Sequence, residues 1–169
     1  MAVLPILHYP DPRLHIKAAL VKSFDAKIRQ LIQDMTETMY HNNGLGLAAS
    51  QVNVHLRIFI MDPARNDEPK RLKAFINPQI SARMGEEFHE EGCLSVPGVF
   101  EKVKRSTHIT VNYQDENGNT FSHSCSGIEA ICIQHEIDHL DGKVFVDYLS
   151  GLKQNFIKKK MKKMFKNEQ

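Results

Sequence analysis

The chain has 169 residues, 41% of them hydrophobic and 25% charged, a balance that fits one folded globular domain and excludes a low-complexity chain. Its formal net charge of +2 is uneven, because residues 152–169 carry seven lysines and one glutamate, or +6, which leaves −4 on the rest. The basic character therefore belongs to a C-terminal tail and not to the body of the protein.

The N-terminal sequence and the cysteine count indicate the cellular compartment. Residues 1–14 lack a basic start followed by an apolar run, and no stretch of about eighteen apolar residues occurs, so we expect neither secretion nor a membrane span. Cys93, Cys125 and Cys132 are odd in number, which does not fit a closed disulfide framework. We expect a single domain over residues 1–169, located in the reducing cytoplasm. No long coiled-coil pattern occurs, and a monomer is the simplest expectation.

The first predicted elements are one helix and several short strands. Residues 25–40 place apolar side chains at three- and four-residue spacing, and Asn42 to Gly44 supply stop signals, which predicts an amphipathic helix. Strand-like segments follow at 45–52, 57–61, 72–76 and 109–113. The last of them turns at residues 115–119 into a further strand that begins at Phe121.

Two more helices are predicted in the C-terminal part. The pattern Ser126-Gly-Ile-Glu129 predicts a capping box, with the Ser126 hydroxyl and the Glu129 carboxylate satisfying free backbone N–H groups, and Gly142 offers a stop. This helix spans about 127–141. Residues 150–166 predict a basic helix with an apolar stripe amid its lysines. The stripe contains Leu152, Phe156, Ile157, Met161, Met164 and Phe165.

The second predicted helix carries the chemistry. His135, Glu136 and His139 form the pattern H-E-x-x-H, in which residues four apart share one helix face, so both imidazoles can reach one metal ion. Glu136 lies about 100° further around the helix, beside such an ion, where it can accept a proton from water. Ile128, Ile131 and Cys132 precede the histidines on the same stripe. They are either an apolar wall beside the metal or simply core.

A catalytic metal needs a third protein ligand and an open position. Phe145 stands where the longer zinc-protease motif has its last histidine and cannot ligate, and Asp147 follows His139 too closely for the other large protease group. The third ligand is better sought upstream, where the thiol of Cys93 follows Gly92. From the residues alone, Cys93 is equally well explained as an ordinary buried cysteine.

Three segments together resemble one enzyme family. Residues 44–51, Gly-Leu-Gly-Leu-Ala-Ala-Ser-Gln, resemble G-x-G-x-A-A-x-Q; residues 91–95 resemble E-G-C-L-S; residues 134–139 resemble Q-H-E-x-D-H. The family is peptide deformylase, which removes the formyl group from N-formylmethionine at the start of new bacterial proteins. With the predicted elements, the resemblance implies an α+β fold, with mostly antiparallel short-stranded sheets around a central H-E-x-x-H helix, an N-terminal helix and a basic C-terminal helix.

The resemblance also implies a catalytic site. Its metal ligands are Cys93, His135 and His139, and Glu136 is the catalytic acid and base. The Gln51 amide and the backbone N–H of Leu94 are expected to hold the oxyanion of the reaction. One divalent ion is implied, Fe²⁺ in the cell, although two imidazoles and a thiolate also suit Zn²⁺, Ni²⁺ or Co²⁺.

Substrate contacts and supporting groups follow from the same comparison. Gly46 would let a peptide backbone lie close to the strand edge. The expected substrate-binding residues are Leu45, Gly46, His89, Gly92, Ile128, Ile131 and Cys132. His89 stands where the family often has an aliphatic residue, and Phe100 where a basic residue sometimes contacts the peptide. Glu91, Arg105 and Asp138 are candidates to support the ligand histidines; alternatively, Arg105 and Asp138 are ordinary solvated charges.

Two other functions share parts of these motifs. A small zinc endopeptidase shares H-E-x-x-H, but Phe145 and the Cys93 motif oppose it, and a metal-stapled RNA-binding module leaves Glu136 and Gln51 unused. The partners implied are N-formylmethionyl nascent chains. The basic helix suggests docking to ribosomal RNA near the exit of the nascent chain; alternatively its lysines are merely solvated, and an anionic membrane surface is a weaker third option.

Overall fold

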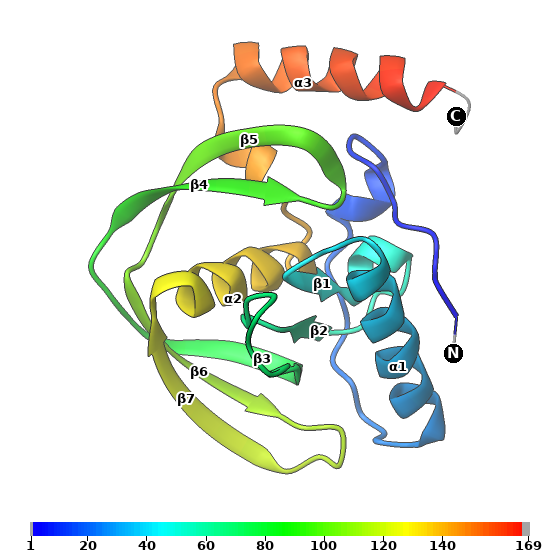
Figure 1. Cartoon of the computed structure of the whole chain (residues 1–169), viewed down its shortest axis with the longest axis vertical. Helices are drawn as coiled ribbons and strands as arrows, with labels where there is room; N and C mark the ends of the chain where they lie inside the picture. Colours follow the sequence, from blue (N-terminus) through cyan, green and yellow to red (C-terminus); the bar gives the residue numbers. More distant parts are fainter. Residues whose placement is uncertain (1, 167–169) are drawn as a thin grey trace.

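Helix α2 (Gly127–Leu140) lies at the centre of the fold, between a five-stranded sheet and a two-stranded hairpin (Figure 1). In the structure, a computed structural model that describes residues 2–166, ten of its fourteen residues are buried. Its apolar residues and its buried polar ones together occupy most of the helix surface, which explains why it lies between two layers of strands. The predicted helix over 127–141 and the α+β fold are confirmed.

The five-stranded sheet has the order β1-β2-β3-β6-β7, and all its neighbours are antiparallel. Its strands are β1 (Gly46–Ala48), β2 (Ile58–Met61), β3 (Lys73–Met84), β6 (His108–Gln114) and β7 (Thr120–Ser126). The face toward α2 carries packed aromatic rings: those of Phe59 and Phe75 are stacked with their centres 4.6 Å apart, and those of Phe75 and Tyr113 are tilted, with centres 4.4 Å apart. Strand β3 continues eight residues beyond the predicted end at Ile76.

The predicted strand over 45–52 is wrong in its second half. After the three residues of β1 the chain turns into a short 3-10 helix, η2 (Ala49–Val52). The Gln51 side-chain oxygen accepts a 2.9 Å hydrogen bond from the backbone N–H of Ala48, which closes the turn locally and ends the strand. This turn also decides where the Gln51 amide points.

The two-stranded sheet was not predicted. It is the hairpin β4 (Glu87–Cys93) and β5 (Val96–Arg105), which lies on the opposite side of α2 from the larger sheet (Figure 1). Its inner face buries Val96 and Val103 together with the charged Glu91 and Arg105. The hairpin therefore covers α2 with a face that is partly ionic.

Helix α1 (Ala26–His41) begins at Asp25, whose side chain accepts a hydrogen bond from the backbone N–H of Ile28. Ile28, Ile32, Met35 and Met39 are buried in a cluster with residues of β1 and β2. Two short 3-10 helices, η1 (Pro12–His15) and η3 (Phe145–Tyr148), flank the core. The predicted helix over 25–40 is thus confirmed.

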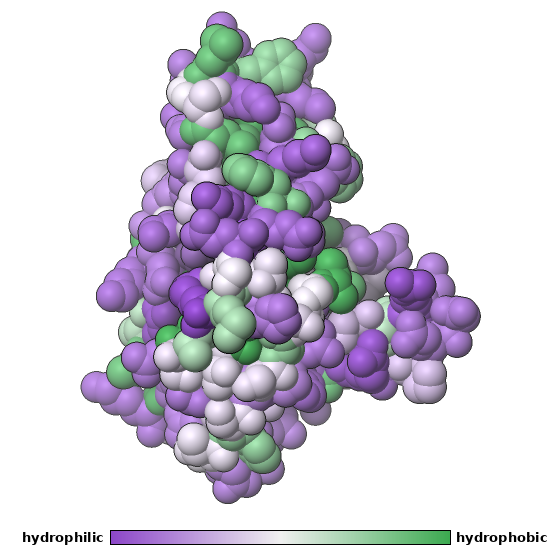
Figure 2. Space-filling view, turned by 90° about the vertical axis from the view of Figure 1, so that its left-hand side faces the viewer, coloured by the Kyte–Doolittle hydropathy of each residue, from purple (hydrophilic) through white to green (hydrophobic). Residues whose placement is uncertain are grey.

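Helix α3 (Gly151–Met164) lies over β5 at the top of Figure 1. Ile157 and Met161 are buried against the valines of β5, whereas Leu152 and Phe156 are 82% and 69% exposed. The predicted helix over 150–166 is confirmed, but only part of its predicted apolar stripe packs on the hairpin. Figure 2 views α3 from its N-terminal end, at the top, and shows apolar residues on its surface beside hydrophilic ones.

The start of α2 differs from the predicted capping box. Ser126 is the N-cap residue, but its side chain makes no capping hydrogen bond. Glu129 turns instead toward β7, where its Oε2 lies 3.0 Å from Nε2 of His123. Within residues 2–166, no helix combines the length and the apolarity that crossing a membrane requires.

Candidate metal and active site

Three metal-ligating side chains from two elements converge between α2 and the hairpin. His135 and His139 stand one turn apart on α2, with their Nε2 atoms 3.2 Å apart. Cys93, at the end of β4, places its Sγ 3.3 Å from Nε2 of His139. Among the described residues, these three form one of two groups whose ligand atoms all lie within 4.8 Å of one another.

This donor set fits a tetrahedral divalent metal ion. Metal–nitrogen bonds of about 2.0–2.1 Å and a metal–sulfur bond of about 2.3 Å separate two nitrogens by roughly 3.3 Å, and nitrogen from sulfur by roughly 3.6 Å. The observed separations of 3.2 and 3.3 Å come close to both values. Three protein donors leave a fourth position for water or substrate, as catalytic sites require.

Glu136 lies beside these ligands and is almost fully buried. Its Oε1 has no hydrogen-bond partner among the described residues. Burial raises the pKa of Glu136 to about 7, the neighbouring His135 opposes that rise, and the charge of Glu91 adds to it. A cation on the adjacent ligands would lower the pKa again. The carboxyl group is therefore able to take up and release a proton near neutral pH.

Gly46 in β1 is where the strand passes closest to this carboxylate. A Cβ atom at this position would lie 2.6 Å from Oε2 of Glu136 and 2.9 Å from Sγ of Cys132, both closer than van der Waals contact. Only glycine therefore lets β1 run directly against the catalytic face of α2. The strand edge, the carboxylate and the thiol of Cys132 all border the same cavity.

The Gln51 amide is held in one orientation. Its oxygen accepts from the N–H of Ala48, which leaves Nε2 to donate to Oγ of Ser95 at 3.0 Å and toward Sγ of Cys93 at 3.5 Å. The amide N–H groups therefore point to the metal ligands, as a donor to a developing oxyanion would. Sequence reasoning assigned no role to Ser95, although it is the last residue of the matched motif over residues 91–95.

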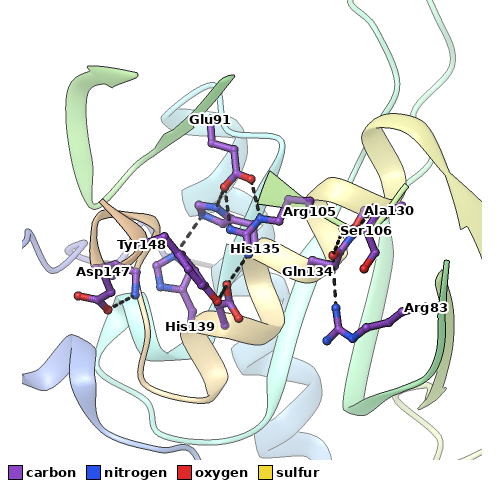
Figure 3. A network of polar contacts seen from close by, with 12 residues as sticks. Arg83, Glu91, Arg105, Ser106, Ala130, Gln134, His135, His139, Asp147 and Tyr148 are labelled. Atoms are coloured by element: carbon purple, nitrogen blue, oxygen red, sulfur yellow. Dashed lines mark hydrogen bonds and ion pairs between the residues drawn. The ribbon is translucent and has the colours of Figure 1, made fainter. Parts of the chain in front are cut away.

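A buried ionic network supports His135 (Figure 3). Its Nδ1 lies 2.9 Å from Oε1 of Glu91, and because a carboxylate only accepts, Nδ1 carries the proton and Nε2 is free to ligate. Arg105 donates to both oxygens of Glu91, at 2.6 and 2.8 Å, and to Asp138 at 2.5 Å. The structure thus brings together all three predicted supporting residues.

Electrostatics keep this network charged and the second imidazole neutral. Burial works to raise the pKa of Glu91, but the hydrogen bonds and charges of Arg105 and His135 outweigh it and hold the pKa at about 2. Burial lowers the pKa of His139 far below its usual value, and His135 and Arg105 add to this. Nδ1 of His139 has no hydrogen-bond partner within residues 2–166, so only His135 has the supporting contact.

Two further residues of this region were missed by sequence reasoning. The hydroxyl of Tyr148 donates to Asp138 at 2.9 Å, and the guanidinium of Arg105 lies 5.2 Å from the centre of the same ring. Gln134 binds the backbone of Ser106 with both its amide nitrogen and its oxygen, each at 2.9 Å, and so fixes α2 to the end of β5. No sequence pattern identifies Tyr148, whereas Gln134 belongs to the matched motif.

A cavity of about 500 Å³ opens onto the metal ligands. Most of the predicted substrate contacts line it, namely Leu45, Gly46, Gly92, Ile128, Ile131 and Cys132, together with Leu94 at the hairpin turn. Phe100 also lines it and fills the space next to Gly92, where a Cβ atom would lie 2.6 Å from the ring. His89 is not among the lining residues; its ring pairs instead with Glu87 at 3.4 Å.

The longer zinc-protease motif does not supply a metal ligand in this structure. Phe145, at the position of their last histidine, is buried in the cluster beneath β5, with its ring centre 6.3 Å from that of His135. Three side chains able to ligate a metal ion, beside a buried carboxyl group and a cavity lined largely by apolar residues, form the arrangement expected of a metal-dependent hydrolase.

Comparison with known proteins identifies the family. Residues 3–155 match the family model described as polypeptide deformylase. Peptide deformylase 1 of Burkholderia multivorans is 52% identical over 97% of this chain and 90% of its own length. The peptide deformylase of Chromobacterium violaceum is also 52% identical, over 96% of both chains. The chain therefore belongs to the polypeptide deformylase family, as its motifs predicted.

Solved structures agree with this assignment. The crystal structure of peptide deformylase from Ehrlichia chaffeensis in complex with actinonin has a TM-score of 0.93 and 44% identity, covering 98% of this chain and 99% of that one. The peptide deformylase of Legionella pneumophila has a TM-score of 0.92 and 41% identity over 99% and 98%. The chain is an enzyme that removes the formyl group from the N-terminal formylmethionine of newly synthesised polypeptides.

Proposed function

We propose that this hydrolysis proceeds on one divalent ion held by Cys93, His135 and His139, with Glu136 as general base and then general acid. The observation that carries the proposal is the convergence of three ligand atoms. Nε2 of His139 lies 3.2 Å from Nε2 of His135 and 3.3 Å from Sγ of Cys93. Beside them is a buried carboxyl oxygen of Glu136 that has no hydrogen-bond partner in the described part of the chain. Bound there, a metal ion would polarise the formyl carbonyl and make a water molecule acidic enough to react near neutral pH.

Glu136 moves the proton. It accepts a proton from the attacking water and delivers it to the nitrogen of methionine, so that the C–N bond breaks and formate leaves. Burial favours the protonated form of this carboxyl group and a bound cation would favour its ionised form, so both forms are accessible during the cycle. The closeness of Gly46 keeps the carboxylate from turning away from the reacting water.

Gln51 and Leu94 stabilise the oxyanion that forms on the formyl carbon. Nε2 of Gln51 already points to the ligand cluster, because the Ala48 N–H holds the amide oxygen on the other side. Leu94 follows Cys93 at the hairpin turn, where its backbone N–H would be the second donor. Donors fixed before the reaction cost no reorganisation during it.

The methionine side chain lies against the apolar part of the cavity. Leu45, Ile128, Ile131 and Cys132 supply a wall for a flexible unbranched chain, and Gly92 borders the same cavity. His89 contributes little in this proposal, since its ring is engaged with Glu87.

Formate release from a formyl-methionyl peptide tests these roles. Glu136→Ala should keep the metal content of the wild type while lowering kcat by at least about 10²-fold, the usual contribution of a general acid–base group. Glu116→Gln is the matched control, because it removes an exposed carboxylate in the turn between β6 and β7. A Glu136→Ala enzyme that releases formate at a rate near that of the wild type would contradict the assignment.

We propose Fe²⁺ as the ion used in the cell, with Zn²⁺, Ni²⁺ or Co²⁺ as substitutes, because a thiolate and two imidazoles accept all four. Metal analysis of protein purified without oxygen tests this, with parallel samples exposed to air. Iron in the anaerobic sample, and its loss together with activity in air, is the expected result. Zinc at full occupancy in both samples, with equal activity, would refute the proposal. The three free cysteines favour a reducing cytoplasm as the compartment.

We further propose that the outer face of α3 docks on ribosomal RNA. Lys159, Lys162 and Lys163 are exposed and lie outside the contacts that hold α3 to the hairpin, whereas Lys153 pairs with Glu101 at 3.0 Å. Three lysine side chains on the exposed outer face of α3 favour a polyanionic partner over a neutral one.

Charge substitution tests this docking without removing the buried part of α3. A triple Lys→Gln variant at 159, 162 and 163 should co-sediment less with ribosomes and show a smaller salt dependence, with unchanged activity on short peptides. The matched control replaces three exposed lysines elsewhere, Lys17, Lys22 and Lys27. Equal loss of binding in both variants, or none in either, would refute the proposal.

A further inference from the structure

A second group of metal-ligating side chains lies outside the catalytic cavity. His123 and Cys125 are two residues apart in β7, so their side chains leave the same face of the strand. Glu129 reaches that face from the first turn of α2, because Gly127, with a positive φ of 64°, allows a sharp turn between the two elements. A strand end and a helix start thus place an imidazole, a thiol and a carboxylate together.

The three ligand atoms are close enough for one ion. Nε2 of His123 lies 3.0 Å from Oε2 of Glu129, and all three ligand atoms lie within 4.8 Å of one another. A tetrahedral ion needs such donors about 3.3–3.6 Å apart, which small side-chain rotations can reach. All three residues are partly exposed, so an ion from solution can enter and one ligand position stays open to water.

Neighbouring charges permit a cation at this place. Arg71 lies 3.9 Å from Oε1 of Glu129, but its side chain is largely exposed and can move away. Burial, aided by Glu129, raises the pKa of the Cys125 thiol to about 11, while Lys73 lowers it. An incoming ion would therefore displace a proton from the thiol, as zinc does at cysteine sites.

We propose that His123, Cys125 and Glu129 form a second metal site, which binds one Zn²⁺-like divalent ion and ties the end of β7 to the start of α2. The imidazole and thiolate select such ions over Mg²⁺ or Ca²⁺, which prefer oxygen ligands. The site is separate from the catalytic one. None of its residues lines the cavity, and Glu129 precedes His135 by six residues, about 9 Å along the helix axis.

Titration with Co²⁺ tests the proposal on the full chain after its metal has been removed with a chelator. Each site contains one cysteine, so each bound ion adds a thiolate-to-cobalt charge-transfer band. The wild type should bind two equivalents, and Cys125→Ala should bind one, with about half the absorbance and unchanged formate release. His123→Ala and Glu129→Gln should weaken the second equivalent only. Retained formate release also shows that the variant has folded.

Two control variants make the outcome decisive. Ser122→Ala, at an exposed neighbouring position of β7, should still bind two equivalents. Cys93→Ala should lose the catalytic equivalent and keep the second one, so that failure of the catalytic proposal can be told apart from failure of this one. Binding of a single equivalent by the wild type, or of two by Cys125→Ala, would overturn the proposal.

Discussion

Replacing Gly46 by alanine is expected to disable the enzyme through a single methyl group. The added Cβ would lie 2.6 Å from Oε2 of Glu136 and 2.9 Å from Sγ of Cys132. Non-bonded heavy atoms attract best at about 3.5–4.0 Å, so the carboxylate has to move by roughly 1 Å or β1 has to move off the helix. Both Glu136 and the strand are tightly packed, and neither shift leaves the reaction geometry intact.

The size of the effect follows from the precision that catalysis requires. A misplacement of about 1 Å costs on the order of 10²-fold in rate, or about 3 kcal/mol of transition-state stabilisation. Kinetics of formate release with a formyl-methionyl peptide should show this loss mainly in kcat, with the metal content unchanged. Gly151→Ala is the matched control, because a Cβ there meets nothing within 4 Å.

The reasoning fails if Gly46→Ala keeps kcat/KM within about threefold of the wild type while its metal content and unfolding midpoint are also unchanged. Such a result would mean that Glu136 has room to turn without loss of function. The role of β1 would then be limited to the binding of the peptide, and the close approach of the strand would not set the catalytic geometry.

Three further predictions concern the supporting network and the metal. Arg105→Ala leaves Glu91 buried without its guanidinium partner and should destabilise folding by about 3–5 kcal/mol in urea, whereas Arg13→Ala, which breaks an exposed pair, should leave the midpoint unchanged. Tyr148→Phe should cost about 0.5–1.5 kcal/mol through the lost bond to Asp138; equal stability would count against that bond. Removal of the metal by a chelator should lower Tm, and added Zn²⁺ should restore it, since a ligand at a thousandfold its Kd stabilises the folded state by about 4 kcal/mol. An unchanged Tm would contradict metal binding by the folded state.

The sequence predicts the helices well because their signals are local. For α1, apolar spacing, an Asp25 cap and an Asn-Asn-Gly stop define an element that the structure starts and ends within one residue of the prediction. For α2, the histidines continue the apolar stripe, so the motif that predicts the metal also predicts the buried face. The ligand trio itself needed the motif resemblance, since nothing near Cys93 indicates which helix its thiol meets.

The hairpin β4–β5 could not be predicted because it buries charged residues and exposes apolar ones, the reverse of the usual pattern. Glu91 and Arg105 point inward, where they support His135, whereas Phe88 and Phe100 are 63% and 65% exposed. Alternation of apolar and polar residues therefore gives no usable signal. The capping box failed for a similar reason, because a contact with His123 on another element holds Glu129.

The position of α2 in the chain has a consequence for when the enzyme can form. This helix is the centre of the core, yet it ends at Leu140 of a 169-residue chain, after every strand of both sheets. During synthesis β1 and β2 can pack on α1, but the aromatic face of the larger sheet has no α2 to cover it, and two of the three ligand residues do not yet exist. This part of the core and the site therefore form together, only after about five-sixths of the chain has been made.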